Sequence, residues 1–303
     1  VNVTIITDLD SLIYFRKRET YQPATFIYEN ELGEKFTQAI KVKPRGKYRR
    51  RVCDFPTIKL DFKKKALKAS GMAKYDKYKL VTHCVDDKKE SRENVLREYL
   101  VYKMYNLLSP QSYRVQLINI TYKDSKEKIN TLERTAFLIE ATKELEDRLD
   151  VDLKASLKLP IDSFDLEQYN FVALFQYMIG NVDWRATPFA KNIKIMKSPT
   201  TDAYELIPYD FDFSGVVGVS YMRLAEHLNQ KNARQRIFLG HIINDQSELQ
   251  KNFALFETKK EALLSLISNF ELLCKPSRRS IRRYINSFYE DIADGMVATA
   301  LLE

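Results

Sequence analysis

Two aspartates and one asparagine in the second half of the chain lie in short polar segments that border apolar ones. Asp183 is part of Gly-Asn-Val-Asp-Trp, Asn192 of Lys-Asn-Ile, and Asp210 of Pro-Tyr-Asp-Phe-Asp. One carboxylate and one carboxamide oxygen are sufficient protein ligands for Mg²⁺ when a nucleotide supplies phosphate oxygens. A second carboxylate can then accept a proton from an attacking hydroxyl. A single Asp at the end of an element is more often a cap or turn residue, so the prediction depends on the combination.

Hydrophobic periodicity predicts the elements that must position these residues. A helix over residues 166–179 ends just before the Asp183 segment, and a strand-like stretch over 192–208 has Asn192 at its start. Asp210 follows the end of that stretch, so we expect the three side chains to converge. Further helical patterns cover residues 221–228, 247–270 and 278–292. The second half is therefore predicted to be mostly helical, with a small ribbon.

The first half is predicted to be mainly sheet. Alternating or β-branched segments predict strands at residues 1–9, 36–42, 56–62, 113–122 and 135–140. One helix over residues 92–108 interrupts them, with Ser91 as its N-cap and Pro110 beyond its end. The sequence thus predicts the α+β class, with a β-rich domain at residues 1–140 and a mainly helical domain at 141–303.

Positive charge is concentrated in the first half. The formal net charge is +8, and residues 41–80 hold fifteen Lys and Arg against three Asp. Such a segment attracts phosphate-bearing partners such as nucleotides, nucleic acid or phospholipid head groups. The alternative is a solvated charged face without a ligand.

Composition places the chain among globular proteins, since 45% of its 303 residues are hydrophobic and 30% are charged. No apolar run reaches the roughly 18 to 20 residues of a membrane span, so a soluble protein is expected. Because the sequence starts at Val1, a signal peptide cannot be assessed and the localisation stays open. Cys53, Cys84 and Cys274 are odd in number and lack metal-ligand spacing, so buried free thiols are expected.

Several strings, taken in order, resemble a known family. Gly-Asn-Val-Asp-Trp, Lys-Asn-Ile-Lys-Ile-Met-Lys and Pro-Tyr-Asp-Phe-Asp look like the catalytic loop, metal-binding Asn and metal-binding Asp of atypical protein kinases of the spore-coat protein H (CotH) type. Arg-Gly-Lys at 45–47 and Ile-Lys-Leu-Asp-Phe at 58–62 look like its small-lobe segments. The resemblance covers residues 1–215 and is strongest to uncharacterised bacterial relatives of that family.

The resemblance implies a two-lobed protein-kinase-like fold, with a β-rich N-terminal lobe and a mainly helical C-terminal lobe. It also implies an ATP-dependent phosphotransferase acting on a hydroxyl acceptor such as a protein. Asp183 would be the catalytic base, Asn192 and Asp210 would hold Mg²⁺ or Mn²⁺, and Asp212 would be a second metal ligand. Lys59 would contact the phosphates and pair with Glu98, a catalytic pair on two different elements.

The chain departs from ordinary kinases in two ways. It has no Gly-x-Gly-x-x-Gly loop, so neighbouring cations would have to hold the phosphates together with Lys59. The candidates are Arg45, Lys47, Arg49 and Arg50. The interval from Asp183 to Asn192 is also longer than in kinases, which indicates an insertion around residues 186–190.

Two other functions stay open beside an active enzyme, which is favoured. One is a catalytically inactive kinase-like module that only binds nucleotide, as the missing glycine loop would allow. The other is a nucleic-acid-binding protein that uses basic residues 41–80, although the segment Lys63–Lys65 has no interleaved aromatic residues. The acceptor, the oligomeric state and the role of residues 216–303 do not follow from the sequence.

Overall fold

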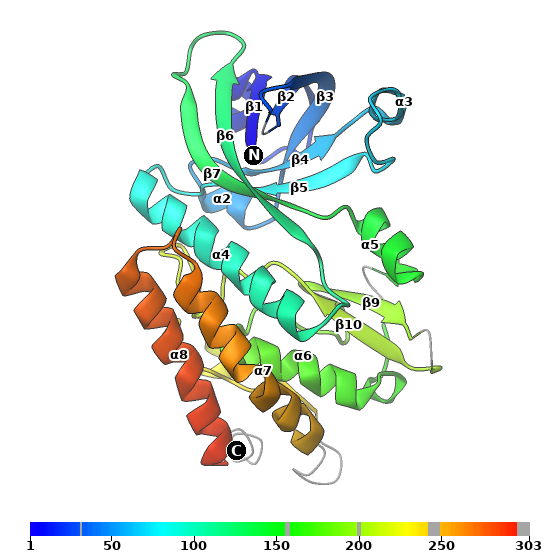
Figure 1. Ribbon diagram of the computed structural model, residues 1–303, viewed down its shortest axis with the longest axis vertical. Coiled ribbons are helices and arrows are strands. Elements are labelled where there is room, and N and C mark those ends of the chain that lie inside the picture. The colour runs from blue at the N-terminus through cyan, green and yellow to red at the C-terminus, as the bar shows by residue number, and fades with distance from the viewer. Residues whose placement is uncertain (31, 155–157, 199–200, 242–248, 296–303) are drawn as a thin grey trace. The chain divides into compact units, whose positions relative to one another are not determined.

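The computed structural model describes residues 1–303 except 31, 155–157, 199–200, 242–248 and 296–303 (Figure 1). The chain forms two compact units. The first comprises Val1–Tyr99 and Arg114–Leu145, and the second comprises Leu100–Tyr113 and Glu146–Glu303. Both units are thus discontinuous in sequence, whereas the sequence predicts one boundary at residue 140.

The first unit contains a closed barrel. Its strands are β1 (Asn2–Thr7), β2 (Gln22–Glu29), β3 (Lys35–Arg45), β4 (Thr57–Asp61), β5 (Lys77–Val81), β6 (Val115–Asp124) and β7 (Leu132–Ile139). They follow the order β1-β2-β3-β4-β5-β7-β6, and β1 closes the barrel by pairing in parallel with β6. The prediction of a two-lobed protein-kinase-like fold with a β-rich N-terminal lobe is therefore wrong, because these strands form a closed mixed barrel. Alternation of apolar and polar residues predicts a strand, but it does not show which other strand pairs with it to close the barrel.

Alternating side chains of the strands fill the barrel. Its core includes Ile5, Phe26, Val42, Ile58, Leu60, Leu80, Ile118 and Tyr122. Lys59 lies between Ile58 and Leu60 on β4, so its side chain belongs to the outer face. The same alternation places Lys43 of β3 and Lys79 of β5 on that face.

Short helices and one long helix accompany the barrel. They are α1 (Leu9–Tyr14), α2 (Arg49–Val52), α3 (Lys64–Ala69), α4 (Lys88–Leu108) and α5 (Thr142–Leu149), of which α4 and α5 continue into the second unit. Cys53, directly after α2, forms a disulfide with Cys84, and Cys274 is free and exposed. The expectation of three buried free thiols is wrong, because spacing along the chain does not show which distant cysteines the barrel brings together.

The second unit is built around α6 (Leu166–Ile179), which is buried from Tyr169 to its end. A small sheet has the order β10-β9-β8, with β8 at Leu153–Lys154, β9 at Ile193–Lys197 and β10 at Tyr204–Pro208. The helices α7 (Gln250–Asn269) and α8 (Lys275–Ala293) pack against each other and against α6 (Figure 1). None of the described helices is long and apolar enough to cross a membrane.

The helix predicted over residues 221–228 is wrong, since only a 3₁₀ turn at Glu226–Leu228 forms there. The preceding segment bonds to the end of α6 instead, where the N–H of Val216 donates to the carbonyl of Ile179 at 3.1 Å. Leu224, an apolar residue of this segment, is 39% exposed, so the predicted helix would have no core to pack against. Residues 247–248, where the next helix was predicted to begin, lie outside the described residues.

Candidate functional site

The end of α6 fixes the start of the Asp183 loop. The helix begins at the N-cap Asp165, whose carboxylate accepts the N–H of Gln168 at 3.0 Å. It ends at Gly180, which has φ +66° and ends the helix in the left-handed conformation. A Cβ at Gly180 would overlap the hydroxyl of Tyr284, so the position requires glycine for both its backbone and its surroundings. The chain therefore leaves α6 in one defined direction.

A buried amide next to this glycine carries the loop forward. Asn181 is fully buried, and its Nδ2 donates to Oε1 of Gln176 at 2.9 Å. Its Oδ1 accepts the backbone N–H of Asp183 at 3.0 Å. Because buried amides of this kind are costly to leave unpaired, the two bonds hold the backbone of Asp183 against α6.

Asn192 returns to Asp183 despite its distance along the sequence. Its Nδ2 donates to the Asp183 carboxylate at 2.9 Å and to the Asp183 carbonyl at 2.7 Å. The intervening residues form a small hairpin closed by backbone bonds of 2.8 and 3.2 Å between Arg185 and Lys191. The residues of this hairpin leave the main path of the chain and return to it, which brings Asn192 beside Asp183.

Asn192 and Asp210 flank the same end of the β9–β10 ribbon. Ile193 pairs with Pro208, and just beyond them the N–H of Tyr209 donates to the carbonyl of Asn192 at 3.0 Å. Both Asn192 and Asp210 adopt positive φ, at +54° and +65°. Non-glycine residues rarely adopt this conformation, and such strain concentrates at functional sites.

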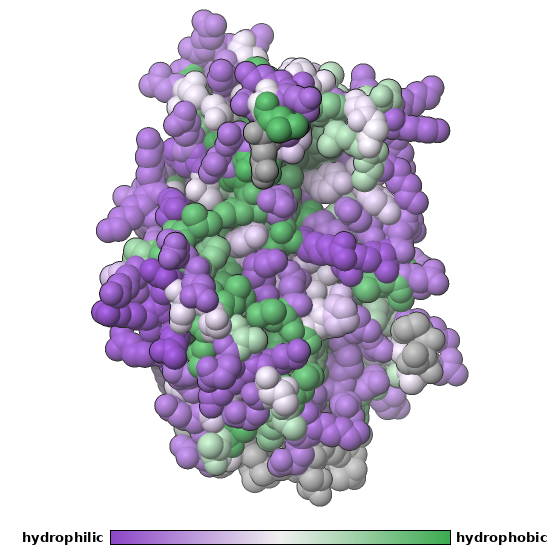
Figure 2. All heavy atoms as spheres, viewed as in Figure 1, coloured by the Kyte–Doolittle hydropathy of each residue, from purple (hydrophilic) through white to green (hydrophobic). Residues whose placement is uncertain are grey.

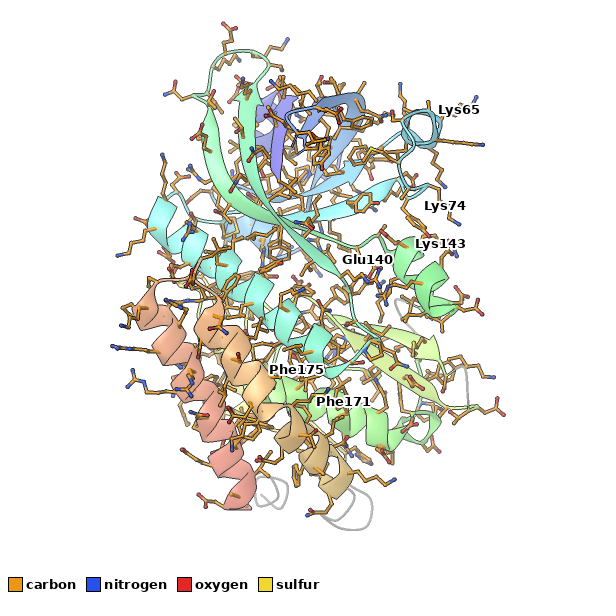
Figure 3. The ribbon with its side chains drawn as sticks, in the orientation of Figure 1. Lys65, Lys74, Glu140, Lys143, Phe171 and Phe175 are labelled. Atoms are coloured by element: carbon orange, nitrogen blue, oxygen red, sulfur yellow. A yellow bond between two sulfur atoms is a disulfide. The ribbon has the colours of Figure 1, made fainter. Side chains whose placement is uncertain are left out.

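Aromatic packing holds Asp210 and its neighbour in place. Phe171 and Phe175 project from α6, and the ring of Phe175 lies 5.7 Å from that of Phe211 (Figure 3). The ring centres of Tyr102 and Phe211 lie 4.7 Å apart, and the hydroxyl of Tyr102 accepts the N–H of Asp210 at 2.9 Å. Phe211, which directly follows Asp210, is therefore fixed in the core of the second unit.

The electrostatic surroundings of Asp183 act in opposite directions. Burial raises the pKa of its carboxyl, and the negative charge of Asp210 raises it further. An ion pair with Lys191 and the hydrogen bond from Asn192 lower it, but the net effect is a raised pKa. Lys191 was not among the predicted site residues, although it directly precedes Asn192.

The arrangement fits a divalent cation held by few protein ligands. In the part of the chain that the structure describes, the Asp210 carboxylate has no hydrogen bond or ion pair, yet it lies close enough to Asp183 to raise its pKa. A cation stabilises two neighbouring carboxylates that would otherwise repel each other. No three His, Cys, Asp or Glu of the described residues converge as metal ligands, so phosphate and water would have to complete the shell.

Asp212 lies apart from this pair in its contacts. It is buried, and its carboxylate accepts a hydrogen bond of 3.5 Å from the hydroxyl of Tyr221. Its role as a second metal ligand stays a prediction.

In the first unit, the structure pairs Glu98 with Arg49 rather than with Lys59. The guanidinium of Arg49 lies 2.8 Å from the Glu98 carboxylate, and both side chains are buried. Glu98 thus has Arg49 as its ion-pair partner in place of the predicted Lys59, whereas the phosphate contact of Arg49 stays a prediction. The physical reason is that the planar guanidinium suits a buried carboxylate, while Lys59 belongs to the outer barrel face.

Lys59 instead lies in a row of cations across three strands. Lys43 is directly opposite Lys59 on β3, and Lys79 is directly opposite it on β5. Burial lowers the pKa of Lys59, and the charges of Lys43 and Lys77 lower it further. Like charges in directly opposite positions destabilise a sheet, and Lys43 offsets part of this cost by pairing with Glu19 at 3.6 Å.

The remaining predicted phosphate ligands lie around α2. Arg45 ends β3, Lys47 is exposed, and Arg50 is bound to Glu19 at 2.7 Å. Arg50 also donates to the carbonyl of Gly46 at 3.2 Å. Of this group, only Arg45 and Lys47 have no carboxylate partner in the described residues.

Comparison with known proteins gives a distant structural similarity. No protein-family model and no curated protein matches the chain. The chain is similar to the crystal structure of CtkA, a Helicobacter pylori proinflammatory kinase, with 12% sequence identity and a TM-score of 0.41. The match covers 81% of this chain and 94% of that chain. Values this low assign neither a family nor an activity, so the CotH-type resemblance stays a prediction.

Proposed function

We propose that the chain is a metal-dependent phosphotransferase that moves a phosphoryl group from ATP to a hydroxyl acceptor. One observation carries the proposal: Asp183, with its raised pKa, is held by Asn192 beside an Asp210 carboxylate without a protein partner among the described residues. The resemblance to CotH-type kinases predicts the same three residues. The acceptor is a hydroxyl compound such as a protein side chain.

Asp183 would act on the acceptor. As the acceptor oxygen forms its bond to phosphorus and the bond to the leaving phosphate oxygen breaks, the hydroxyl proton passes to the Asp183 carboxylate. A raised pKa makes this carboxylate a better proton acceptor than an ordinary Asp. Lys191 balances its charge in the resting state.

Asp210 and Asn192 would hold Mg²⁺ or Mn²⁺ at the end of the β9–β10 ribbon. The metal, when bound, neutralises charge on the phosphates of the nucleotide. The side-chain nitrogen of Asn192 is used by Asp183, which leaves its oxygen for the metal. Within the first unit, Lys59 in the row of Lys43 and Lys79 stays the predicted phosphate ligand.

A catalytically inactive nucleotide-binding module is the second candidate. Two observations favour it: Lys191 occupies the carboxylate of the proposed base, and Arg49 occupies that of Glu98. Such a module would bind ATP with metal and transfer nothing.

The first test measures the melting temperature with ATP, with and without Mg²⁺ or Mn²⁺. A ligand of the native state must raise it. We expect Asp210→Asn to lose the metal-dependent part of the shift. Asp202→Asn is the matched control, because Asp202 is exposed and pairs with Lys197 at 2.9 Å. A metal-independent shift in the unmodified protein would remove Asp210 from the site.

The second test separates the two candidates. Asp183→Asn should leave ATP binding nearly intact and lower phosphoryl transfer at least ~100-fold, as expected for a lost general base. Metal-dependent ATP binding without transfer to any acceptor in a broad panel would establish the inactive module. Binding of nucleic acid without ATP binding would instead support the basic segment 41–80 as a nucleic-acid site.

A further inference from the structure

The helix α8 carries its charges in an unusual order. Five cations occupy its first half, namely Lys275, Arg278, Arg279, Arg282 and Arg283. Its acidic residues, Glu290 and Asp291, lie near its end. A helix is stabilised by anions at its N-terminus and by cations at its C-terminus, which is the reverse. Helix stability therefore does not account for these cations.

Four of these cations form one exposed face, which we call the α8 basic face. It consists of Lys275, Arg279, Arg282 and Arg283, all exposed. The opposite side of the helix, with Ile281, Tyr284, Ile285 and Phe288, is buried. Among the described residues no carboxylate pairs with any of the four. Repulsion between like charges three and four residues apart adds a further cost.

Neighbouring cations are held rigidly beside this face. The Nη1 atom of Arg234 donates to the hydroxyl of Ser280 at 3.0 Å, and its guanidinium lies 4.5 Å from the ring centre of Tyr284. Arg278 donates to the carbonyl of Ser268. Figure 2 shows hydrophilic side chains gathered over the first turns of α8. Arg234 and Arg278 thus extend the cationic surface beside the α8 basic face.

We propose that the α8 basic face docks the protein on an anionic lipid surface. Guanidinium groups bind phosphate head groups through paired hydrogen bonds. Leu272, just before the helix, is 46% exposed and supplies an apolar contact next to Lys275. The inference is independent of the proposed phosphotransferase activity.

Nucleic acid fits the surface less well. Single-stranded nucleic acid is bound by aromatic rings that stack on bases, and the aromatic residues of α8, Tyr284, Phe288 and Tyr289, are all buried. The buried disulfide between Cys53 and Cys84 is of the kind that forms in an oxidising compartment.

Vesicle sedimentation tests the proposal. The unmodified protein should sediment with vesicles of phosphatidylcholine mixed with phosphatidylglycerol, and not with phosphatidylcholine alone. The triple variant Arg279→Gln, Arg282→Gln and Arg283→Gln should bind roughly 100-fold more weakly, since each basic residue near an anionic surface contributes about fivefold. Added salt should weaken binding of the unmodified protein.

A matched variant controls for net charge. Lys63→Gln, Lys64→Gln and Lys65→Gln remove the same charge from the first unit, and this variant should bind the vesicles within about threefold of the unmodified protein. Both variants should keep their melting temperatures, because the replaced residues are exposed. Equal weakening in both variants would show a net-charge effect and overturn the proposal. So would binding to duplex DNA or polyglutamate, lost in the α8 variant, without any binding to vesicles.

Discussion

Asp183 is the residue whose charge state depends most directly on its neighbours in this site. Burial and Asp210 favour its protonated form, while Lys191 and Asn192 favour the carboxylate. The folded protein therefore holds a proton on Asp183 at pH values where an ordinary Asp, with a pKa of about 3.9, has lost it. In the proposed phosphotransferase, Asp183 would act as a base only above this raised pKa, which would set the acid limb of the rate profile.

We predict that two substitutions move the pKa of Asp183 in opposite directions. Lys191→Met removes the ion pair and should raise it further, whereas Asp210→Asn removes a like charge and should lower it. The measurement is an NMR titration of the labelled Asp carboxyl carbons without nucleotide or metal. Lys197→Met is the control, because Lys197 pairs with the exposed Asp202. If both site variants shift the titration the same way, Asp183 and Asp210 do not share a site.

Sequence reasoning anticipated the convergence of Asn192 with Asp183 but not that of Lys191. The interval from Asp183 to Asn192 is longer than in kinases, and the hairpin closed by Arg185 and Lys191 accommodates it. The same closure places the Lys191 ammonium on the Asp183 carboxylate. A lysine among 49 Lys and Arg gives no signal of its own, so only the hairpin geometry reveals it.

At the scale of elements, the position of the one-turn helix α2 determines which cation forms an ion pair with Glu98. Arg49 is the first residue of α2, and its buried guanidinium group pairs with Glu98 of α4. The sequence shows an acidic residue on a partly apolar helical stripe and many nearby cations, without showing which of them is buried. The resemblance predicts Lys59 as the partner of Glu98, but the alternation of β4 places the Lys59 side chain on the outer face of the barrel.

We predict strong energetic coupling between Arg49 and Glu98. Arg49→Met or Glu98→Gln alone should lower the free energy of unfolding of the first unit by about 3 to 5 kcal/mol, because each removes one partner of a buried ion pair. The double variant should be little worse than either single one. Lys59→Met, which relieves repulsion within the lysine row, should change it by less than about 1 kcal/mol. A double-mutant cycle by denaturant unfolding provides the measurement, and coupling of Glu98 to Lys59 instead would restore the original pairing.

Most long elements were predictable, and their closure was not. The helix α6 and the strands β4 and β6 lie within about two residues of their predicted bounds, because strong periodicity determines such segments. β2 was missed, since Pro23 and polar residues interrupt its alternation. The barrel depends on the parallel pairing of β1 with β6, which joins residues such as Asn2 and Asn119. No local pattern encodes contacts over that distance.

For the whole molecule, the disulfide is the covalent constraint that the described residues contain. It joins the end of α2 to the segment after β5, and the N–H of Asp54 donates to the carbonyl of Cys84 at 2.8 Å. Both sulfur-bearing side chains are buried, as in a structural bond rather than a labile one. The bond lies wholly within the first unit, so its loss should act on that unit.

We predict that Cys53→Ser with Cys84→Ser lowers the free energy of unfolding of the first unit by about 3 to 4 kcal/mol, because the bond closes a loop with a sequence separation of 31 residues. Two compact units allow two unfolding transitions, so calorimetry should show one transition moved to lower temperature and the other nearly unchanged. Excess reductant should move the same transition of the unmodified protein by a similar amount. Cys274→Ser is the control, since Cys274 is free and exposed, and it should match the unmodified protein with and without reductant. A Cys274 effect as large as that of the pair, or no response to reductant, would mean that Cys53 and Cys84 are not joined in solution and would also remove the argument for an oxidising compartment.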